Sequence, residues 1–278
     1  MFWQMHEVER TREMKDIKDV IKGRGGFVIG MVHCLPLPGS PAFQGDIDKI
    51  MEQAVDDAKT LERGGVDAVM VENTNDSPYS EYISKAQVAA LSAATALVKK
   101  EISIPVGVDA SFNDCEASLG IAVANKCDFI RVPVFIDTIV NGCGVLTPCA
   151  YKVIDLRKRL HAEKIMLLCD IQVKHSHMLL PQVPIEWSAT NAVAAGADAI
   201  VVTGTTTGEE TPIDMIQRVK NVVNIPVMAG SGINPNDIAE QFKIADGAIV
   251  GSTFKKNGLT TNPVEYDLVR KLLEPLGR

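Results

Sequence analysis

Two glycine–serine segments near the end of the chain have the composition of a phosphate-binding site. One is Gly230-Ser231-Gly232, and the other contains Gly251 and Ser252. Glycine allows backbone N–H groups to approach an anion closely, and serine hydroxyls add further donors. A helix that begins after such a loop adds the positive end of its dipole. We therefore predict that both segments hold a phosphate group, and that Lys255 either caps the same anion or lies exposed on the surface.

A second set of polar residues lies within or at the end of apolar segments. Arg131 stands inside the run Phe129-Ile130-Arg131-Val132, and a buried charge is costly unless it is paired. Asp109 and Asp170 are the expected partners. They form either a salt bridge without chemistry or a site in which one carboxylate is a general base and the arginine tunes its pKa or holds substrate. We favour the catalytic interpretation and place Glu72 in the same group.

Similar strand-end positions are occupied by four residues that we predict to contact the substrate: His33, Asn73, Thr203 and Gly204. For His33 the alternative is a buried histidine whose hydrogen bonds are satisfied within the core.

The segment Val173-Lys174-His175-Ser176-His177 adds a lysine and two histidines. A lysine whose pKa is lowered by burial can form a Schiff base, so Lys174 is a candidate catalytic residue. His175 is a candidate for proton transfer, and the two histidines with Asp170 are an alternative metal site. We predict no metal, because no further histidine ligands are evident. We also predict no cofactor, because the sequence contains neither a Rossmann fingerprint nor a P-loop with its lysine.

Eight apolar, β-rich segments position these residues, and each is followed by a segment with helical periodicity. Continuous apolar strands are typical of a parallel sheet buried on both faces, and helices of this length provide the crossovers. The predicted strands are Phe27–His33, Ala68–Asn73, Pro105–Ala110, Phe129–Phe135, Ile165–Ile171, Ala199–Gly204, Pro226–Gly232 and Ala248–Phe254. The predicted helices are Asp46–Arg63, Ser84–Lys100, Asp114–Lys126, Pro148–Ala162, Ile185–Ala195, Pro212–Val223, Asn236–Ile244 and Pro263–Leu273.

Eight such units predict a closed (β/α)₈ (TIM) barrel of the α/β class. A doubly wound open sheet is the alternative, but the pattern shows no switch that would indicate one. In a barrel the active site lies at the carboxyl ends of the strands, and phosphate commonly binds after strands seven and eight. We expect one barrel domain over residues 27–278 and a helical extension over residues 1–26, which covers the bottom of the barrel or forms an oligomer contact.

Composition excludes several classes of protein. The 278 residues are 46% hydrophobic and 23% charged, with a net charge of −7, so a nucleic-acid-binding surface is not expected. No apolar run reaches the roughly 20 residues of a membrane span, so membrane insertion is not expected. The six cysteines form no C-x-x-C pair, and no signal peptide is evident. These features predict reduced thiols, a cytoplasmic location and, with less direct support, a homo-oligomer.

The strand-end motifs resemble those of the BtpA family, including its SgcQ-like members. The segment Ile29–Pro41 matches the family's opening signature, and the similarity continues to about Leu273. Further matching segments are Val71-Glu72-Asn73, Asp76–Tyr79, Val173-Lys174-His175, Gly230-Ser231-Gly232, Asp246–Ser252 and Asn262-Pro263-Val264. The resemblance implies a barrel related to ribulose-phosphate-binding enzymes. It also implies two kinds of role, since the family is named after a factor for photosystem I accumulation, whereas SgcQ-like members resemble components of sugar metabolism.

The leading hypothesis is an enzyme that acts on a small phosphorylated metabolite as a sugar-phosphate isomerase, epimerase or aldolase. Each of these reactions needs proton transfer beside a polarised carbonyl. The alternatives are a non-catalytic assembly or regulatory factor that uses the barrel as a scaffold, and a metabolite sensor. Fold analogy does not choose among them.

Overall fold

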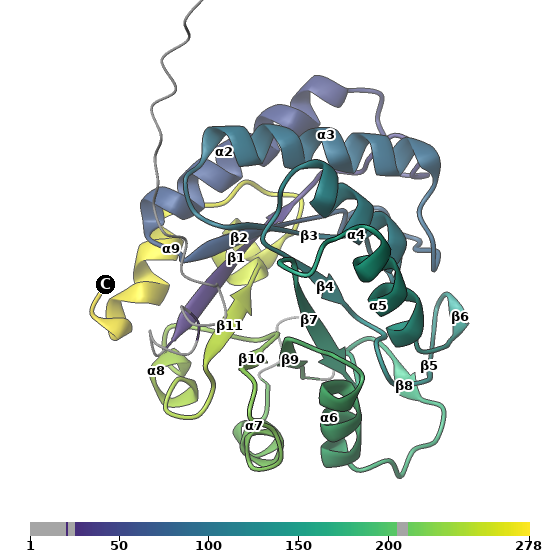
Figure 1. Cartoon of the computed structure of the whole chain (residues 1–278). Helices are drawn as coiled ribbons and strands as arrows, with labels where there is room; N and C mark the ends of the chain where they lie inside the picture. The colour runs from purple at the N-terminus through teal and green to yellow at the C-terminus, as the bar shows by residue number, and fades with distance from the viewer. Residues whose placement is uncertain (1–20, 22–25, 205–210) are drawn as a thin grey trace, which may run out of the picture.

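The centre of the molecule is a closed barrel of eight parallel strands (Figure 1). The computed structural model describes residues 21, 26–204 and 211–278. The last strand pairs with the first and closes the sheet, which confirms the predicted (β/α)₈ fold. The barrel strands are β1 (Phe27–His33), β2 (Ala68–Glu72), β3 (Val106–Asp109), β4 (Phe129–Val132), β7 (Met166–Ile171), β9 (Ala199–Val202), β10 (Val227–Ala229) and β11 (Gly247–Val250).

Helices surround the barrel, one after each strand. They are α2 (Ile47–Gly64), α3 (Lys85–Glu101), α4 (Cys115–Ala124), α5 (Ala150–Arg159), α6 (Ile185–Ala194), α7 (Ile213–Lys220), α8 (Ile238–Gln241) and α9 (Tyr266–Leu273). The sequence itself marks several of their ends. Asp46 caps α2 by accepting a hydrogen bond from the Lys49 backbone, and Ser84 forms a capping box with Gln87 on α3. Gly65 ends α2 with φ of 99°, which glycine adopts without steric cost.

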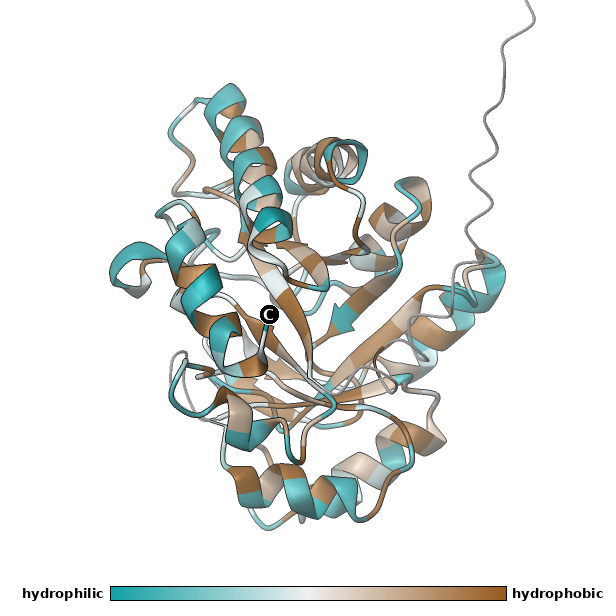
Figure 2. Cartoon of the chain, turned by 90° about the vertical axis from the view of Figure 1, so that its left-hand side faces the viewer, coloured by the Kyte–Doolittle hydropathy of each residue, from teal (hydrophilic) through white to brown (hydrophobic). Residues whose placement is uncertain are grey.

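Alternation along the strands separates two apolar layers. On β1, Phe27, Ile29 and Met31 belong to the cluster that fills the barrel interior. Val28 and Val32 instead pack with the helices, because successive side chains of a strand point to opposite faces. Figure 2 shows the result as brown strands surrounded by helices that carry teal, hydrophilic residues. On five strands, the interior-facing side chain nearest the carboxyl end is polar. These residues are His33, Glu72, Asp109, Arg131 and Asp170.

Element boundaries differ from the prediction where loops begin. The eighth strand ends at Val250, and Ser252–Phe254 forms a short 3₁₀-helix. The fourth strand ends at Val132, and the eighth helix begins at Tyr266 instead of Pro263. The helix predicted over Asn236–Ile244 is reduced to the single turn of α8. Glycine or proline in the other three segments favours turns, which an apolar pattern alone does not reveal.

A small antiparallel sheet beside the barrel was not predicted. It consists of β5 (Ile139–Asn141), β6 (Gly144–Leu146) and β8 (His177–Met178), in the order β6-β5-β8. The strands come from the segments that follow β4 and β7 (Figure 1). Their side chains join Val134 and Val173 in a separate apolar cluster. Strands of two or three residues are too short for a recognisable period-2 pattern.

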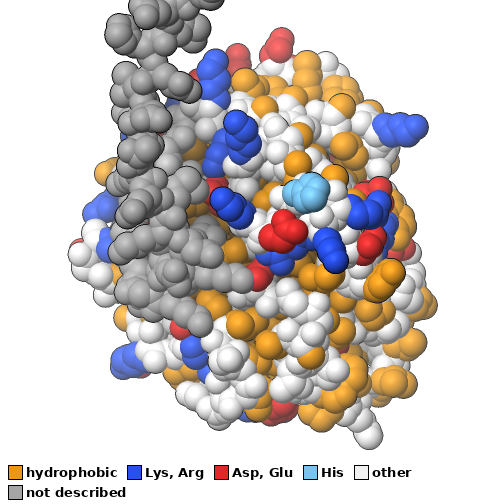
Figure 3. Space-filling view, viewed as in Figure 1, with side chains coloured by type: hydrophobic (Ala, Val, Ile, Leu, Met, Phe, Trp, Pro, Cys, Tyr) orange, Lys and Arg blue, Asp and Glu red, His pale blue; other side chains and the backbone are white. Residues whose placement is uncertain are grey.

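Most of the predicted N-terminal extension lies outside the described residues. Ile21 is described, and its side chain is buried in the cluster that fills the barrel interior. Across the described residues, no helix combines the length and the apolar character that a membrane crossing requires. On the described part of the face seen in Figure 3, acidic and basic side chains lie interspersed among hydrophobic ones.

Candidate active site

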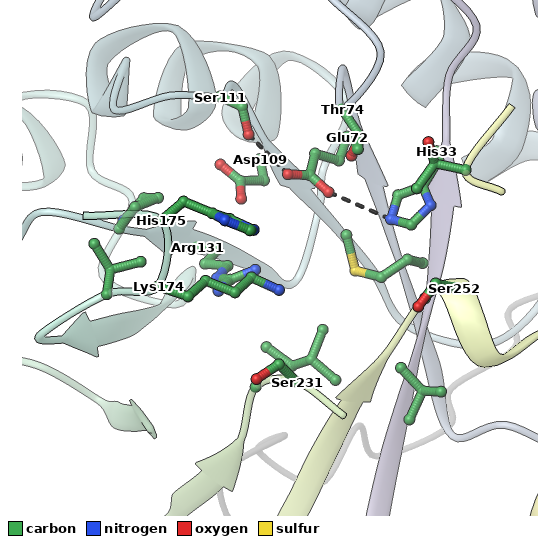
Figure 4. Close-up of a pocket in the computed structure, with 18 of the residues that line it drawn as sticks. His33, Glu72, Thr74, Asp109, Ser111, Arg131, Lys174, His175, Ser231 and Ser252 are labelled. Atoms are coloured by element: carbon green, nitrogen blue, oxygen red, sulfur yellow. Dashed lines mark hydrogen bonds and ion pairs between the residues drawn. The ribbon is translucent and has the colours of Figure 1, made fainter. Parts of the chain in front are cut away.

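A cavity of about 310 Å³ opens at the carboxyl ends of the barrel strands, where TIM-barrel enzymes carry their chemistry. Figure 4 shows polar side chains from several strands pointing into it. The structure brings together most of the predicted site residues, far apart in sequence, on its lining: His33, Glu72, Asp109, Arg131, Lys174, His175, Gly230, Ser231, Gly232, Gly251 and Ser252.

Four predicted site residues lie behind this lining and hold other residues in place. Asp170 binds Arg131, and the Thr203 hydroxyl accepts a hydrogen bond from the Lys174 backbone at 2.9 Å. Gly204 donates its backbone N–H to the Ser231 hydroxyl, also at 2.9 Å. Asn73 donates to Asp76 at 3.0 Å and accepts from the Ser111 backbone at 2.7 Å. In the described part of the chain these four therefore position residues that line the cavity, and their predicted catalytic or substrate-binding roles stay predictions.

Glu72 is the ionised carboxylate of the cavity. Its Oε1 accepts a hydrogen bond from the Ser111 hydroxyl at 2.7 Å, and its Oε2 lies 3.6 Å from His33 Nε2. Burial works to raise the pKa of Glu72, but His33, Arg131 and the hydroxyls of Thr74 and Ser111 together bring it below its ordinary value. Burial lowers the pKa of His33 to about 4, so the ring is neutral at pH 7. Arg131 and the two hydroxyls are then the groups that keep Glu72 ionised.

The pKa of Asp109 is shifted in the opposite direction. It pairs in register with Glu72 on the neighbouring strand and is 1% exposed. Its Oδ1 has no hydrogen-bond partner among the described residues. Burial, followed by the charge of Glu72, raises the pKa of Asp109 well above its ordinary value, and Arg131 only partly opposes this. The surroundings of Asp109 therefore favour its protonated form, in which the carboxyl group has an O–H to donate.

Arg131 is fixed by a two-pronged salt bridge. Its Nε and Nη2 donate to the two oxygens of Asp170, each at 2.7 Å. Both side chains are almost fully buried. Burial lowers the pKa of Arg131, but Asp170, Asp109 and Glu72 together raise it by more, so the guanidinium stays charged. Arg131 nevertheless lines the cavity, and it supplies a fixed positive charge beside both Glu72 and Asp109.

Lys174 and His175 follow β7 and enter the cavity from one side. Figure 4 shows the Lys174 side chain extended with its amine near the middle of the cavity. Burial, then the charge of Arg131, lowers the pKa of Lys174 to about 8. His175 has φ of 59°, in the left-handed region that side chains rarely adopt. Burial and the Lys174 charge lower the pKa of His175, so its imidazole is neutral at pH 7.

The glycine–serine segments form the other side of the cavity. A Cβ at position 251 would lie 2.6 Å from His33 Cε1, and one at position 230 would lie 2.6 Å from the Val201 side chain. Gly232 has φ of 67°. Only glycine therefore fits these positions without displacement or strain. The Gly230 N–H donates to the Val202 carbonyl at 2.7 Å, and elsewhere in the two segments the missing side chains let a ligand approach the backbone closely.

Lys255 does not lie at the cavity, and neither of the two predictions for it is right. Its side chain is fully buried, and Nζ donates to Asp57 Oδ2 at 2.8 Å and to the Asn262 carbonyl at 2.7 Å. The pair connects the loop before α9 to α2, so Lys255 is a structural residue.

Several lining residues were not predicted from the sequence: Thr74, Tyr79, Ser111, Phe112, Thr253 and Thr260. Ser111 follows Asp109 by two positions, so continued alternation was a signal that it faces the interior. Tyr79 lies in a matched family segment. Thr260 had no signal, because only the fold of the last loop brings it near β2. Among the described residues, no cluster of three histidine, cysteine or acidic side chains is arranged to hold a metal ion.

Comparison with known proteins gives a consistent family. The profile of the BtpA family matches residues 25–278. An uncharacterised protein of Pyrococcus abyssi is 39% identical over 246 residues, which cover 88% of this chain and 93% of that protein. The photosystem I biogenesis protein BtpA of Synechocystis is 30% identical over 253 residues, covering 90% of this chain and 87% of that protein.

Solved structures resemble the chain in fold. (S)-3-O-geranylgeranylglyceryl phosphate synthase from Thermoplasma acidophilum, in complex with its substrate sn-glycerol-1-phosphate, has a TM-score of 0.60 at 19% identity and covers 94% of this chain and 98% of that one. N-acetylmannosamine-6-phosphate 2-epimerase from Clostridium perfringens has a TM-score of 0.54 at 16% identity, covering 91% and 93%. Because the profile spans nearly the whole described chain and the relatives align over most of their length, the chain belongs to the BtpA family.

Proposed function

We propose that the protein is an enzyme that binds a small phosphorylated carbonyl compound and transfers a proton beside the carbonyl. One observation carries this proposal: Glu72 and Asp109 lie in register on neighbouring strands and line one cavity, where their surroundings shift the two pKa values in opposite directions. Two carboxyl groups whose pKa values are pushed apart are the usual arrangement of a catalytic base and a catalytic acid.

The glycine–serine segments opposite these carboxyl groups would hold the phosphate. Backbone N–H groups of Ser231, Gly232, Gly251 and Ser252 would provide donors at the position where TIM barrels commonly bind phosphate. The two structurally similar enzymes described above are named for phosphorylated compounds. With the phosphate there, the rest of a small ligand reaches the carboxyl groups across the cavity.

The proposed reaction uses Glu72 in its ionised form and Asp109 in its protonated form. The Glu72 carboxylate removes the proton from the carbon next to the carbonyl, while the Asp109 carboxylic acid donates its proton to the carbonyl oxygen. The product is an enediol, whose developing charge Arg131 stabilises. Return of the proton to the neighbouring carbon gives an isomer, and return to the opposite face of the same carbon gives an epimer. A sugar-phosphate isomerase or epimerase is therefore the preferred class.

Proton exchange in D₂O tests this proposal without knowledge of the physiological substrate. Triose, pentose and hexose phosphates are incubated with the protein, and loss of the α-proton signal is followed by NMR. We expect selective exchange with one of these compounds, and the same compound should raise the Tm. If no phosphorylated compound shifts the Tm and none exchanges, the proposal is wrong.

A role as an assembly factor is the second candidate, because the Synechocystis relative is named for photosystem I biogenesis. Apolar side chains exposed on and near the antiparallel sheet offer a surface for such a role, with Val145 57% and Leu180 68% exposed. A scaffold does not require the paired carboxyl groups, so we prefer the enzyme. A cytoplasmic location and a homo-oligomeric state stay predictions from the sequence.

A further inference from the structure

We propose that Lys174 forms a covalent imine with the substrate carbonyl, so that the cavity makes or breaks a carbon–carbon bond. The substrate class is then a phosphorylated β-hydroxy aldehyde or ketone. This inference rests on the proposed function, which supplies the phosphate and the carbonyl, but it adds a nucleophile and a different reaction.

The placement of Lys174 is the first argument. Its backbone N–H is held by the Thr203 hydroxyl at 2.9 Å, and Val173 before it is buried. The amine reaches into the cavity that Asp109 and Ser231 also line. The anchor therefore fixes where the side chain starts, while its reactive end faces the space for the ligand.

The absence of an ion-pair partner is the second argument. Within the part of the chain that the structure describes, no carboxylate lies within 4.0 Å of the Lys174 amine. The fully buried Lys255 differs, since its amine lies 2.8 Å from an oxygen of Asp57. A lysine that only stabilises the fold resembles Lys255. A lysine that must lose its proton and attack a carbonyl needs the freedom and the neighbouring positive charge that Lys174 has.

The protonation state agrees with this geometry. With a pKa of about 8, about a tenth of Lys174 is a neutral amine at pH 7. An ordinary exposed lysine, with a pKa of about 10.4, is neutral in roughly one molecule in 2,500 at that pH. The neutral amine, which is the form that attacks a carbonyl, is therefore about 200 times more abundant at Lys174 than at an exposed lysine.

The groups around the amine complete the reaction. The neutral amine of Lys174 adds to the carbonyl carbon, and a proton moves from nitrogen to oxygen to give a carbinolamine. The carboxylic acid of Asp109 then donates its proton to the carbinolamine hydroxyl, which leaves as water, and a protonated imine remains. Asp109 is now a carboxylate beside Glu72, and the repulsion between them makes it a strong base.

Cleavage follows from the imine. A carboxylate removes the proton of the β-hydroxyl, the carbon–carbon bond breaks, and its electron pair moves into the imine to form an enamine. One carbonyl product is released. The enamine carbon takes back a proton, and water hydrolyses the imine, which releases the second carbonyl product and restores the Lys174 amine and the proton of Asp109. No oxidant or further reactant is needed.

Reductive trapping with pyridoxal 5′-phosphate, an aldehyde that carries a phosphate, tests the inference on the full-length protein. The protein is incubated with the probe at pH 7, reduced with sodium borohydride and digested, and the modified lysine is located by mass spectrometry. We expect one phosphopyridoxyl group on Lys174 and protection by inorganic phosphate. Dihydroxyacetone phosphate with borohydride should label the same residue.

Two variants and a pH series make the result specific. K174R should lose the label but keep the rise in Tm on addition of phosphate, which shows that it folds. K158R, which changes an exposed lysine on α5, should be labelled like the natural protein. Labelling of Lys174 should rise about tenfold from pH 6 to pH 7 and level off above pH 8, because the neutral fraction saturates there.

The two proposals fail in distinguishable ways. If phosphate raises the Tm but the label is spread over exposed lysines and Lys174 is unmodified, the imine is refuted while the phosphate site stands. If phosphate gives no change in Tm and Lys174 is not labelled, the proposed function fails together with this inference.

Discussion

Replacement of Asp170 by asparagine should be among the most destabilising single changes at the carboxyl end of the barrel. The substitution keeps the shape of the side chain but removes the charge that faces Arg131. Two hydrogen bonds of 2.7 Å join these residues, whose side chains are 7% and 0% exposed. Loss of one partner leaves a guanidinium buried without its counter-charge, which typically costs about 3–5 kcal/mol of unfolding free energy.

A loss of that size is a large part of the total stability of an ordinary domain, which is about 5–15 kcal/mol. In a protein of this length it corresponds to a fall in Tm on the order of 10 °C. Urea denaturation at pH 7, followed by circular dichroism, measures it directly. The control is Asp155→Asn, which breaks an exposed salt bridge to Arg159 on α5 and should cost about 0.5 kcal/mol or less.

A double variant separates the charge from the shape. Arg131→Met together with Asp170→Leu removes both charges and fills the space with apolar atoms, so it should be more stable than Asp170→Asn alone. The reasoning is refuted if Asp170→Asn costs less than about 1 kcal/mol, or if the double variant is the less stable of the two. Either result would mean that Arg131 reaches solvent or a different partner.

Three further predictions concern the cavity. Glu72→Gln should slow α-proton exchange by about 10²–10⁴-fold, because an amide cannot accept the proton. The same variant should keep the rise in Tm that phosphate causes. Unchanged exchange would exclude Glu72 as the base. Gly251→Ala should abolish that Tm rise, since its Cβ would lie 2.6 Å from His33 Cε1. The control Gly142→Ala, which has open space around the added Cβ, should keep it. Equal behaviour of the two variants would place the phosphate elsewhere. Burial lowers the pKa of His33 from 6.5 to about 4. Between these pH values the unfolded chain binds a proton that the folded chain does not. The free energy of unfolding should therefore fall by about 3 kcal/mol as the pH drops from 7 to 4. His33→Gln should flatten this slope in urea titrations, and an identical slope would mean that other groups cause it.

The sequence by itself determined the barrel fold and the position of the candidate site at the carboxyl ends of the strands. Eight apolar segments with intervening helical periodicity leave few topologies, because parallel strands require helical crossovers of one hand. Alternation along a strand is equally local. Once Phe129 faces the interior, Arg131 must face it too, and the same count places Glu72 and Asp109 at the carboxyl ends of β2 and β3.

The tertiary structure alone decided what each of these residues does. The sequence offered Asp109 and Asp170 as equivalent partners of Arg131, but the packing gives Asp170 both hydrogen bonds and raises the pKa of Asp109 by burial. Lys255 and Lys174 look alike in sequence, yet one meets Asp57, 198 positions away, and the other enters the cavity. Burial and electrostatic interactions are sums over groups from many strands, so protonation states and ion pairs are fixed only when the barrel closes.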